Sequence, residues 1–458
     1  MTPLMNRPTQ VMLMAIALLR PSHALAQADA PSTPPAKAEE SSTGLPPQVD
    51  WKFNFDAGWG GFGFGNSLYT DPKEGVNVNY GSNWMEGFIK PSLSATYKLE
   101  SSSEVYGKLS AVGERTYASP PDLVGPDESS FLPEDLSIGW RSGKMFEGLG
   151  ENALDFTVGR APFTLGHGFL LWDGAAEGGS RGGYWSNARK AFKFAAIARF
   201  KVAHHTLESF YLKKDDLPEH ETGSRLWGAN YELKIGESST FGATYMKWWA
   251  KPEIDPQRNG LNVFNLRAYT APFPQAKDLS FELEYAAERN HDALHADAWT
   301  AQAAYQLSAV AWKPKFTYRY AFFQGDDPAT PRNESFDPLF PGFYDWGTWW
   351  QGEIGGEYFL ANSNLKSHLV RAHVSPTEAI GSGLIFYKFL ADQPASYAPG
   401  VTDPNIAVEL DGYTDWKINK HFTASFVLAF ADPQRAVQQA SNRTQSFRYG
   451  MVFLAYSY

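Results

Sequence analysis

Hydrophobic and polar residues alternate with a period of two along many stretches of this chain. In WKFNFDAGW (51–59) one face carries the aromatic side chains from Trp51 to Trp59, and the other carries Lys52, Asn54 and Asp56. Such alternation is typical of a β-strand whose two faces meet different environments. The same pattern, about ten residues long, recurs in segments such as 87–99, 279–288, 313–323 and 406–418.

Strands of this length with one fully apolar face are typical of a membrane-spanning β-barrel. A soluble β-sandwich would show the same alternation, because its apolar faces pack against a second sheet. The aromatic strand ends and the size of the repeating region favour the barrel. The chain also ends on an alternating stretch, FRYGMVFLAYSY (447–458). We expect this last strand to pair with the strand near 51–59, which would close the sheet and remove its edges.

A simple count of strand-like runs gives about nineteen, which is odd and does not suit a barrel that starts and ends on the periplasmic side. Short connections are expected at 100–103, 204–205, 235–239, 375–381 and 418–421, and long extracellular loops at 66–83, 165–189, 251–261, 393–404 and 432–443. The short–long alternation holds only if 326–364 is one extracellular loop that contains the run 347–362. The prediction is therefore an all-β transmembrane antiparallel barrel of about 18 strands.

The first residues read as a secretory signal, residues 1–26. Arg7 supplies a positive charge, residues 11–19 form an apolar run of nine, and Ala24-Leu25-Ala26 gives a cleavage site. Residues 27–48 are rich in Pro, Ala, Glu and Ser and predict a disordered periplasmic tether. The barrel is then expected over residues 49–458. Its location would be the bacterial outer membrane, where it contacts lipid and the barrel assembly machinery.

Composition narrows the function further. The chain has no cysteine and a formal net charge of −10, so a thiolate metal site is impossible and nucleic acid is an unfavourable partner. His291, Asp292 and His295 lie close together but are explained better as a polar connection than as a metal site, and His204-His205 has no third ligand nearby. No Ser/His/acid arrangement stands out. We expect no metal, no cofactor and no enzymatic activity.

Three stretches resemble the alginate export family of outer-membrane barrels. They are FTVGRAPFTLGHGFLLWDGAAEGGSRGGYWSNARKAF (156–192), DPLFPGFYDWGTWWQGEIGGEYFLANSNLKSHLVRAHVSP (337–376), and the final strand pair from 415 to the end. The resemblance implies a monomeric barrel of eighteen strands. It also implies passive export of an acidic polysaccharide through an arginine-rich lumen with a constriction.

The resemblance places Arg160 at the constriction, because this residue stands in the matching Gly-Arg. The sequence departs from the family pattern next to it, since Ala161, Pro162 and Phe163 follow where Arg or Gln would be expected. Strict alternation would also point Arg160 at lipid, unless Gly159 marks a bulge or strand end that redirects it.

Basic residues on the other lumen-facing positions are candidates for contacts with an anionic solute, because arginine binds carboxylates and many weak sites permit conduction. The pore-lining candidates are Arg160, Lys193, Arg199, Lys201, Arg267, Lys315, Arg319 and Arg371. Alternatively, these side chains pair with lumen carboxylates in ion ladders that stabilise the barrel. The candidate carboxylates are Glu208, Glu232, Glu282, Glu409 and Asp411.

The glycine-rich loop 165–189 is expected to fold inward and narrow the lumen. Its constriction candidates are Arg181, Tyr184, Trp185 and Arg189, whose aromatic rings and guanidinium groups suit sugar rings and acidic groups. If this loop instead points outward, it is an ordinary surface loop. In the second long loop, Trp346, Trp349 and Trp350 could stack on sugars or pack the loop on itself.

The leading interpretation is a passive outer-membrane channel that exports an anionic, alginate-like polysaccharide or oligosaccharide. An exporter would need a synthase and a periplasmic export scaffold as partners. The alternative is a general or substrate-specific uptake porin for small solutes, which works alone. An outer-membrane enzyme or adhesin whose loops perform the function is a third hypothesis.

Overall fold

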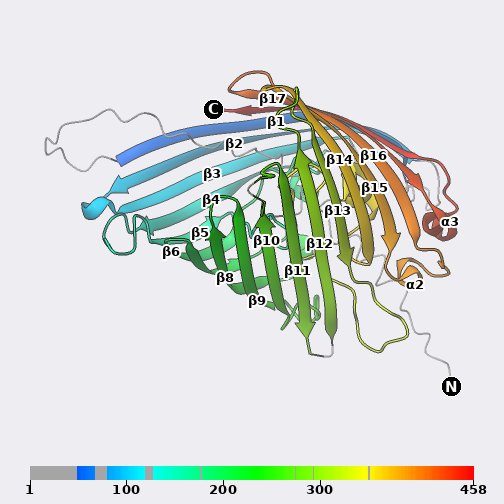
Figure 1. Ribbon diagram of the computed structural model, residues 1–458, viewed down its shortest axis with the longest axis horizontal. Helices are drawn as coiled ribbons and strands as arrows, with labels where there is room; N and C mark the ends of the chain where they lie inside the picture. The colour runs from blue at the N-terminus through cyan, green and yellow to red at the C-terminus, as the bar shows by residue number, and fades with distance from the viewer. Residues whose placement is uncertain are drawn as a thin grey trace.

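The computed structural model describes residues 49–67, 80–118, 127–175, 178–273, 275–291, 293–348 and 351–458. The predicted signal peptide and tether lie outside these residues. The described residues form one antiparallel sheet of eighteen strands that closes into a barrel (Figure 1). The strands are β1 (Val49–Ser67), β2 (Tyr80–Lys98), β3 (Glu104–Tyr117), β4 (Ser129–Arg141), β5 (Leu154–Ala161), β6 (Phe192–Val202), β7 (His205–Lys213), β8 (Arg225–Ile235), β9 (Ser239–Trp249), β10 (Asn262–Thr270), β11 (Leu279–Asn290), β12 (Leu294–Gln306), β13 (Lys315–Phe323), β14 (Leu365–Thr377), β15 (Ile380–Ala391), β16 (Asn405–Lys417), β17 (Phe422–Pro433) and β18 (Phe447–Ser457).

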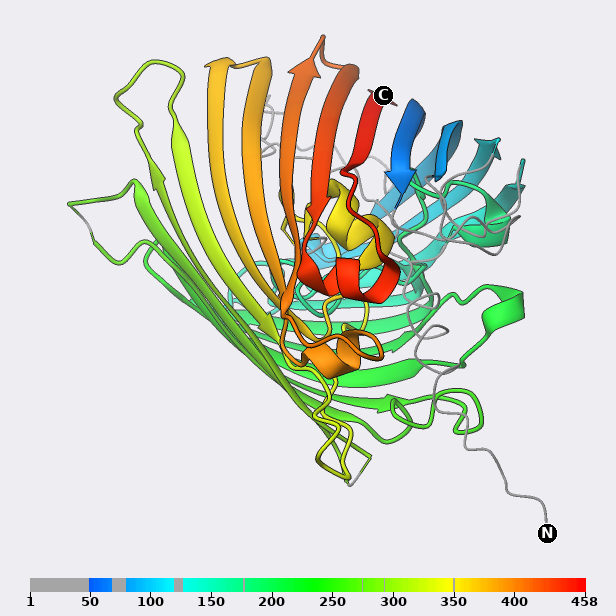
Figure 2. The same ribbon diagram turned by 90° about the vertical axis from the view of Figure 1, so that its right-hand side faces the viewer.

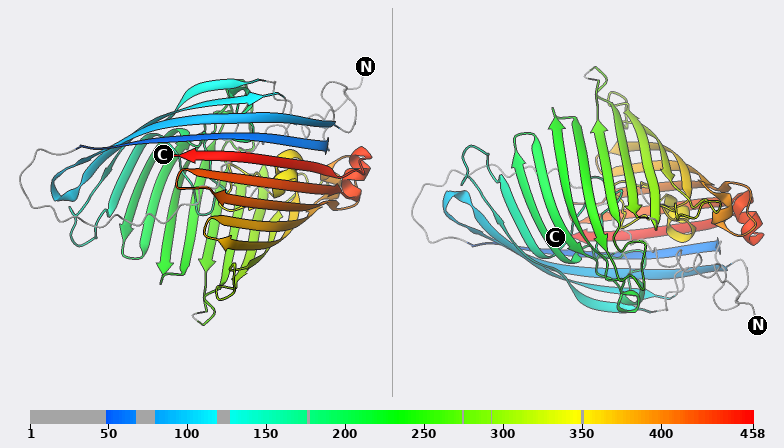
Figure 3. Two further views of the ribbon diagram at one scale, coloured as in Figure 1. Left: turned by 90° about the horizontal axis from the view of Figure 1, so that it is seen from above. Right: turned by 90° about the horizontal axis from the view of Figure 1, so that it is seen from below.

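The last strand closes the barrel against the first, as predicted. β18 pairs antiparallel with β1 over ten residues, with Trp59 opposite Leu454 and Asp56 opposite Ser457. The backbone N–H of Phe55 also donates to the carbonyl of Tyr458 at 3.2 Å. Figure 3 shows the red β18 beside the blue β1. Closure leaves every strand with two neighbours, so no edge is exposed.

The two faces of the strands differ as the alternation predicted. Large apolar side chains on the outer face are exposed, among them Trp51 at 66% and Leu428 at 63%. Side chains at intervening positions point into the barrel, where residues such as Trp248 and Tyr387 are fully buried. An apolar exterior around a filled interior is the arrangement that a lipid environment stabilises.

Most connections agree with the predicted alternation of short turns and long loops, with two exceptions: the extracellular β11–β12 connection (291–293) is short, and the β4–β5 connection at the other end (142–153) is long. β13 ends at Phe323 and β14 begins at Leu365, so the run 347–362 lies in a loop and not in the wall. That loop contains the π-helix η4 (Gly352–Phe359). Other short helices lie in connections: η1 (Glu100–Ser102), η2 (Gly179–Arg181), η3 (Pro218–His220), α2 (Pro394–Tyr397) and α3 (Arg435–Ser441). Most of the predicted loop 66–83 lies outside the described residues.

The wall of the barrel is uneven in height. β1 and β2 each run for 19 residues, whereas β5 has only 8. Figure 1 shows the long strands along the top and the shorter β5–β9 below them. Across the described residues, no helix has the length and apolar character needed to cross a membrane. Because turns are short at the end where β1 begins and β18 finishes, we assign that end to the periplasm.

Candidate functional site in the barrel lumen

Two loops fold into the lumen from the extracellular end. One is the β5–β6 loop (residues 162–191) and the other is the β13–β14 loop (residues 324–364). Most described residues of the β5–β6 loop and nearly all of η4 are buried. Figure 2 shows the yellow η4 enclosed by the strands, and Figure 3 agrees from above and below. We refer to the inward-folded parts of both loops together as the plug.

Three glutamates on consecutive strands hold the β5–β6 loop by its backbone. Glu86 on β2 accepts the N–H groups of Trp185 and Ser186, both at 2.8 Å. Glu114 on β3 accepts the N–H of Ala188. Glu134 on β4 accepts the N–H groups of Lys190 and Ala191 at 2.5 and 2.7 Å. These bonds to side-chain carboxyl oxygens satisfy a loop backbone that has no sheet partner.

Three arginines then converge on one carboxylate, Asp215, two residues beyond the end of β7. Arg160 and Arg189 each place Nη2 against Oδ2 of Asp215, at 2.8 and 2.5 Å. Nη2 of Arg181 lies 3.6 Å from the other carboxylate oxygen and also donates to the backbone carbonyl of Asp216 at 2.7 Å. Burial alone would raise the pKa of Asp215, but the hydrogen bond from Arg160 and the three guanidinium charges outweigh it and lower that pKa.

The lumen position of Arg160 depends on a local irregularity in β5. The β5–β6 register shifts between Gly159 and Ala161, and Gly159 has φ +126°. A Cβ at Gly159 would lie 2.2 Å from the carbonyl oxygen of Leu136, so only glycine fits there. This register shift turns the side chain of Arg160 away from the lipid-facing surface and toward Asp215. Gly159 thus marks the irregularity that was predicted from the sequence as the condition for Arg160 to face the lumen.

Most of the other basic candidates lie on the inner wall and pair with carboxylates. Arg199 bonds Glu208 on the next strand. Arg267 contacts Glu232 at 3.1 Å, and Lys193 lies 3.8 Å from Glu221. These contacts are those expected of ion ladders, the alternative that the sequence left open.

Two further arginines reach from the wall to the β13–β14 loop. Arg371 on β14 pairs with Asp345 at 2.5 Å, and Arg319 on β13 donates to the carbonyl of Gly347 at 3.0 Å. The nearby positive charge of Arg371 lowers the pKa of Asp345 even though burial opposes the shift. Lys315 begins β13, and Lys201 lies one residue before the end of β6, so both stand at the periplasmic end.

Carboxyl groups of the wall anchor the β13–β14 loop by its backbone, as they anchor the β5–β6 loop. Glu409 on β16 accepts the N–H groups of Ile354 and Gly355, both at 2.7 Å. Asp411 on the same strand accepts the N–H of Glu353 at 3.2 Å. These are the first N–H groups of η4, which lack a partner within the helix, so wall carboxylates both cap the helix and fix it in the lumen.

The two loops also bind each other. The backbones of Leu170 and Trp172 exchange hydrogen bonds with Phe340 at 3.0 and 2.8 Å. The ring of His167 lies between those of Tyr269 and Tyr344, with centroids 3.9 and 4.2 Å away. The plug therefore reaches from β2–β4 on one side of the lumen to β13–β16 on the other.

Below the plug, on the periplasmic side, lies a cavity of about 1140 Å³. The plug contributes its roof through Trp185, Phe343, Trp346 and Glu353. The walls come from strands β1, β2 and β14–β18, and the rim comes from the periplasmic turns with Lys313 and Lys420. Trp346 stacks on Tyr413 with ring centroids 5.0 Å apart and donates from Nε1 to Asp415 at 2.6 Å.

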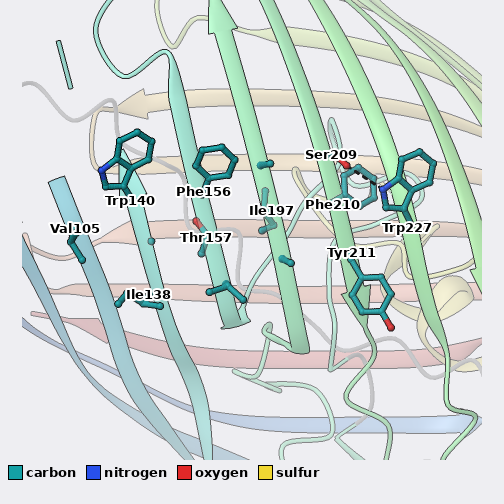
Figure 4. Close-up of a pocket in the computed structure, with 14 residues that line it drawn as sticks. Val105, Ile138, Trp140, Phe156, Thr157, Ile197, Ser209, Phe210, Tyr211 and Trp227 are labelled. Atoms are coloured by element: carbon teal, nitrogen blue, oxygen red, sulfur yellow. Dashed lines mark hydrogen bonds between the residues drawn. The ribbon is translucent and has the colours of Figure 1, made fainter. Parts of the chain in front are cut away.

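A second hollow, of about 600 Å³, lies on the outer wall across β3–β8 (Figure 4). Trp140 and Phe156 stand at one end of it, and Tyr211 and Trp227 at the other. The small side chains of Ala196 and Ala198 also line it. The only side-chain hydrogen bond drawn there joins Trp227 to Ser209 at 3.2 Å. Because the hollow lies on the lipid-facing surface, acyl chains cover it, and it is not a path for solutes.

The remaining motifs have structural roles. Nε2 of His295 contacts the carbonyl of His291 at 2.7 Å in the β11–β12 turn, while Asp292 lies outside the described residues. His205 bonds the hydroxyl of Tyr231 at 2.7 Å. The described part of the chain contains no group of three His, Asp or Glu that could hold a metal ion. Trp349 and Trp350 lie outside the described residues.

Sequence reasoning missed the anchoring carboxylates Glu86, Glu114, Glu134 and Asp215, as well as Glu353 and Asp415. Each of the carboxylates on a strand lies at an inward-facing position. The alternation of the sequence therefore predicts that it faces the lumen, but it does not predict which residues it contacts. The position of Glu86 next to Glu114 follows from the pairing of β2 with β3, in which Glu86 lies opposite Thr116. This pairing cannot be derived from the alternation within either strand.

Comparison with known proteins gives a family and a fold. The model of a family described as alginate export matches residues 145–450. No curated protein matches. Among solved structures, Acinetobacter baumannii OccAB2 superposes with a TM-score of 0.57 at 12% identity, covering 89% of this chain and 98% of that chain. Pseudomonas aeruginosa opdK, an outer membrane protein, gives 0.56 at 9% identity, with 89% and 98% covered. These likenesses show the fold of the barrel.

Proposed function

Because the chain belongs to the alginate export family, we propose that it is a passive outer-membrane channel that exports an acidic polysaccharide or oligosaccharide. The observation that carries this proposal is the arginine cluster at the plug. Three guanidinium groups share the carboxylate of Asp215. Guanidinium groups bind the carboxylates of uronic acids, and a site with several of them can pass an acidic chain from one contact to the next.

The cluster is closed in this conformation. The side chains of Arg160, Arg181 and Arg189 are only 18%, 10% and 2% exposed. An acidic polymer would therefore reach them only when the β5–β6 loop moves, and its carboxylates would then replace Asp215.

The second candidate function is a substrate-specific porin for small solutes. The plug favours it, because two loops fold into the lumen where a polymer would have to pass. The cavity beneath the plug, at about 1140 Å³, lies just above the usual range of small-molecule sites, about 300–1000 Å³, and is large enough to hold a small solute. Such a porin would need no export scaffold.

Single-channel conductance in a planar bilayer tests the proposal. We expect anion preference and block by polyuronate, and we expect both to disappear in an Arg160→Ala, Arg199→Ala double variant. Arg435→Ala is the matched control, since Arg435 is exposed on α3 outside the lumen. Cation preference with no effect of polyuronate would contradict acidic export and leave the small-solute porin.

A further inference from the structure

The periplasmic cavity combines aromatic rings with the carboxylates of Glu353 and Asp415, and one oxygen of Glu353 lacks a hydrogen-bond partner. The carboxylate of Glu353 is 4% exposed, belongs to η4 and lines the cavity. Its Oε2 has no hydrogen-bond partner among the described residues. A buried carboxylate oxygen without a donor costs free energy unless a bound group or water supplies one. Glu353 is therefore prepared for a donor that arrives from the cavity.

Aromatic side chains flank this carboxylate on the same surface. Trp185 comes from the β5–β6 loop, and its indole lies beside Glu353. Trp346 comes from the β13–β14 loop and is held in one orientation by Tyr413 and Asp415. Asp415 lines the cavity as well and also accepts a hydrogen bond from Ser425 at 2.6 Å. Fixed aromatic faces beside hydrogen-bond acceptors suit a ligand with an apolar face and several hydroxyl donors.

We infer that this cavity is a saccharide-binding site open to the periplasm. A sugar ring would pack its C–H face on Trp346, and its hydroxyls would donate to Glu353 and Asp415. Hydrogen bonds from hydroxyl groups to carboxylates are short and strong. A volume of about 1140 Å³ exceeds the usual range for one small ligand, so a short oligosaccharide fits better than a single ring.

The charges of the cavity also assign an orientation to the sugar. The carboxylates of Glu353 and Asp415 lie in the roof and wall, whereas Lys313, Lys417 and Lys420 belong to the periplasmic ends and turns at the rim. A uronate ring would turn its hydroxyls toward the roof and its carboxylate toward the rim lysines. This orientation deepens the proposed export function and rests on it, whereas the hydroxyl-binding roof would be the same in a porin.

The test is calorimetric titration of the detergent-solubilised full chain with maltotriose and with a mannuronate trisaccharide. We expect both to bind, and we expect Glu353→Gln and Trp346→Ala each to weaken binding of both sugars at least tenfold. Glu357→Gln is the matched control, because Glu357 belongs to the same helix but does not line the cavity. A Lys417→Ala, Lys420→Ala double variant should weaken only the mannuronate trisaccharide.

Heat-modified migration in gels, which reports the folded barrel, shows whether each variant has folded. The inference is wrong if neither sugar binds, or if sugar binding by folded Glu353→Gln and Trp346→Ala matches that of the unmutated chain. Anion-selective conductance without cavity binding would overturn the inference and leave acidic export standing. Cavity binding without anion-selective conductance would support the site and contradict acidic export.

Discussion

The two halves of the plug are anchored alike but present different chemistry. In both, wall carboxylates accept the backbone N–H groups of the loop: Glu86, Glu114 and Glu134 hold the β5–β6 loop, and Glu409 holds η4. The β5–β6 loop, however, supplies arginines of its own to Asp215, and these are buried. The β13–β14 loop receives its arginines from the wall and turns aromatic rings and Glu353 toward the cavity.

This difference shows that residues that fix a loop in the lumen are distinct from residues that can contact a solute. The arginines of the lumen mainly fix the loops, because they already contact Asp215 or Asp345. The exposed chemistry of the lumen lies on the other half, around Trp346 and Asp415. A count of lumen arginines is thus a poor guide to selectivity unless their partners are known.

The largest effect is expected from Asp215→Asn, which removes the common partner of three buried arginines. Breaking a buried ion pair from one side costs about 3–5 kcal/mol, so the β5–β6 loop should leave the lumen. Conductance in a planar bilayer should rise and protease should cut within residues 178–191. Asp403→Asn is the matched control, because Asp403 lies in an exposed loop. Unchanged conductance and protection would mean that the three glutamates alone hold this loop.

A smaller effect is expected from Glu409→Gln on the other half of the plug. The variant weakens the hydrogen bonds that this carboxyl group accepts from Ile354 and Gly355, each worth about 0.5–1.5 kcal/mol. Amide hydrogen exchange at these two residues should accelerate by about tenfold for each 1.4 kcal/mol lost. Glu357→Gln should leave their exchange unchanged, and equal acceleration in the two variants would argue against a specific anchor.

The sequence predicted the wall far better than the plug. Alternation within each strand is a local signal, and the strand positions followed from it. The closure of β18 on β1 followed from the need to remove sheet edges, and the loop placement of residues 347–362 followed from the even strand count and the lengths of the connections. Packing of the loops depends on contacts between residues about a hundred positions apart, such as those of Glu86 with Trp185 and Ser186. No local pattern encodes such contacts.

Arg160 shows why the position of one site residue could not be predicted from the sequence alone. Its neighbours indicated a strand that would point it at lipid, and Gly159 alone hinted at a bulge. The partner Asp215 lies 55 positions away in the connection after β7. Whether Arg160 and the other candidates bind a solute stays a prediction, which the conductance experiment addresses.

The pKa values of Asp215 and Glu353 shift in opposite directions, so the contributions of these two groups should depend on pH with opposite sign. The lowered pKa of Asp215 means that its contribution is complete above its unfolded pKa and is lost only as pH falls through the folded value. Burial, followed by the charges of Asp411 and Asp415, raises the pKa of Glu353 well above 4.5. Its stabilising contribution is therefore present below about 4.5 and decreases as pH rises from there.

Spin labels can follow both loops, because the chain has no native cysteine. Labels at Ser180→Cys and Ala361→Cys report the β5–β6 and β13–β14 loops. Above about pH 5 the second label should become more mobile, and Glu353→Gln should reduce that change. Asp345 is held by Arg371, so both loops should loosen under strong acid. If the second label kept the same mobility from pH 5 to 9, or changed equally in the Glu353→Gln variant, the assignment to Glu353 would be wrong.

The smallest effect is expected from Lys193→Ala. Lys193 lies 3.8 Å from Glu221, and the two side chains are 44% and 41% exposed. Exposed ion pairs contribute about 0–1 kcal/mol, since water screens the charges and the side chains lose freedom when they pair. Thermal unfolding should therefore match that of the unmutated chain, whereas Arg189→Ala, which removes a 2% exposed side chain from Asp215, should lower the midpoint clearly. If both variants unfolded alike, buried and exposed lumen pairs would contribute equally, and the plug would owe its position to the glutamates of the wall.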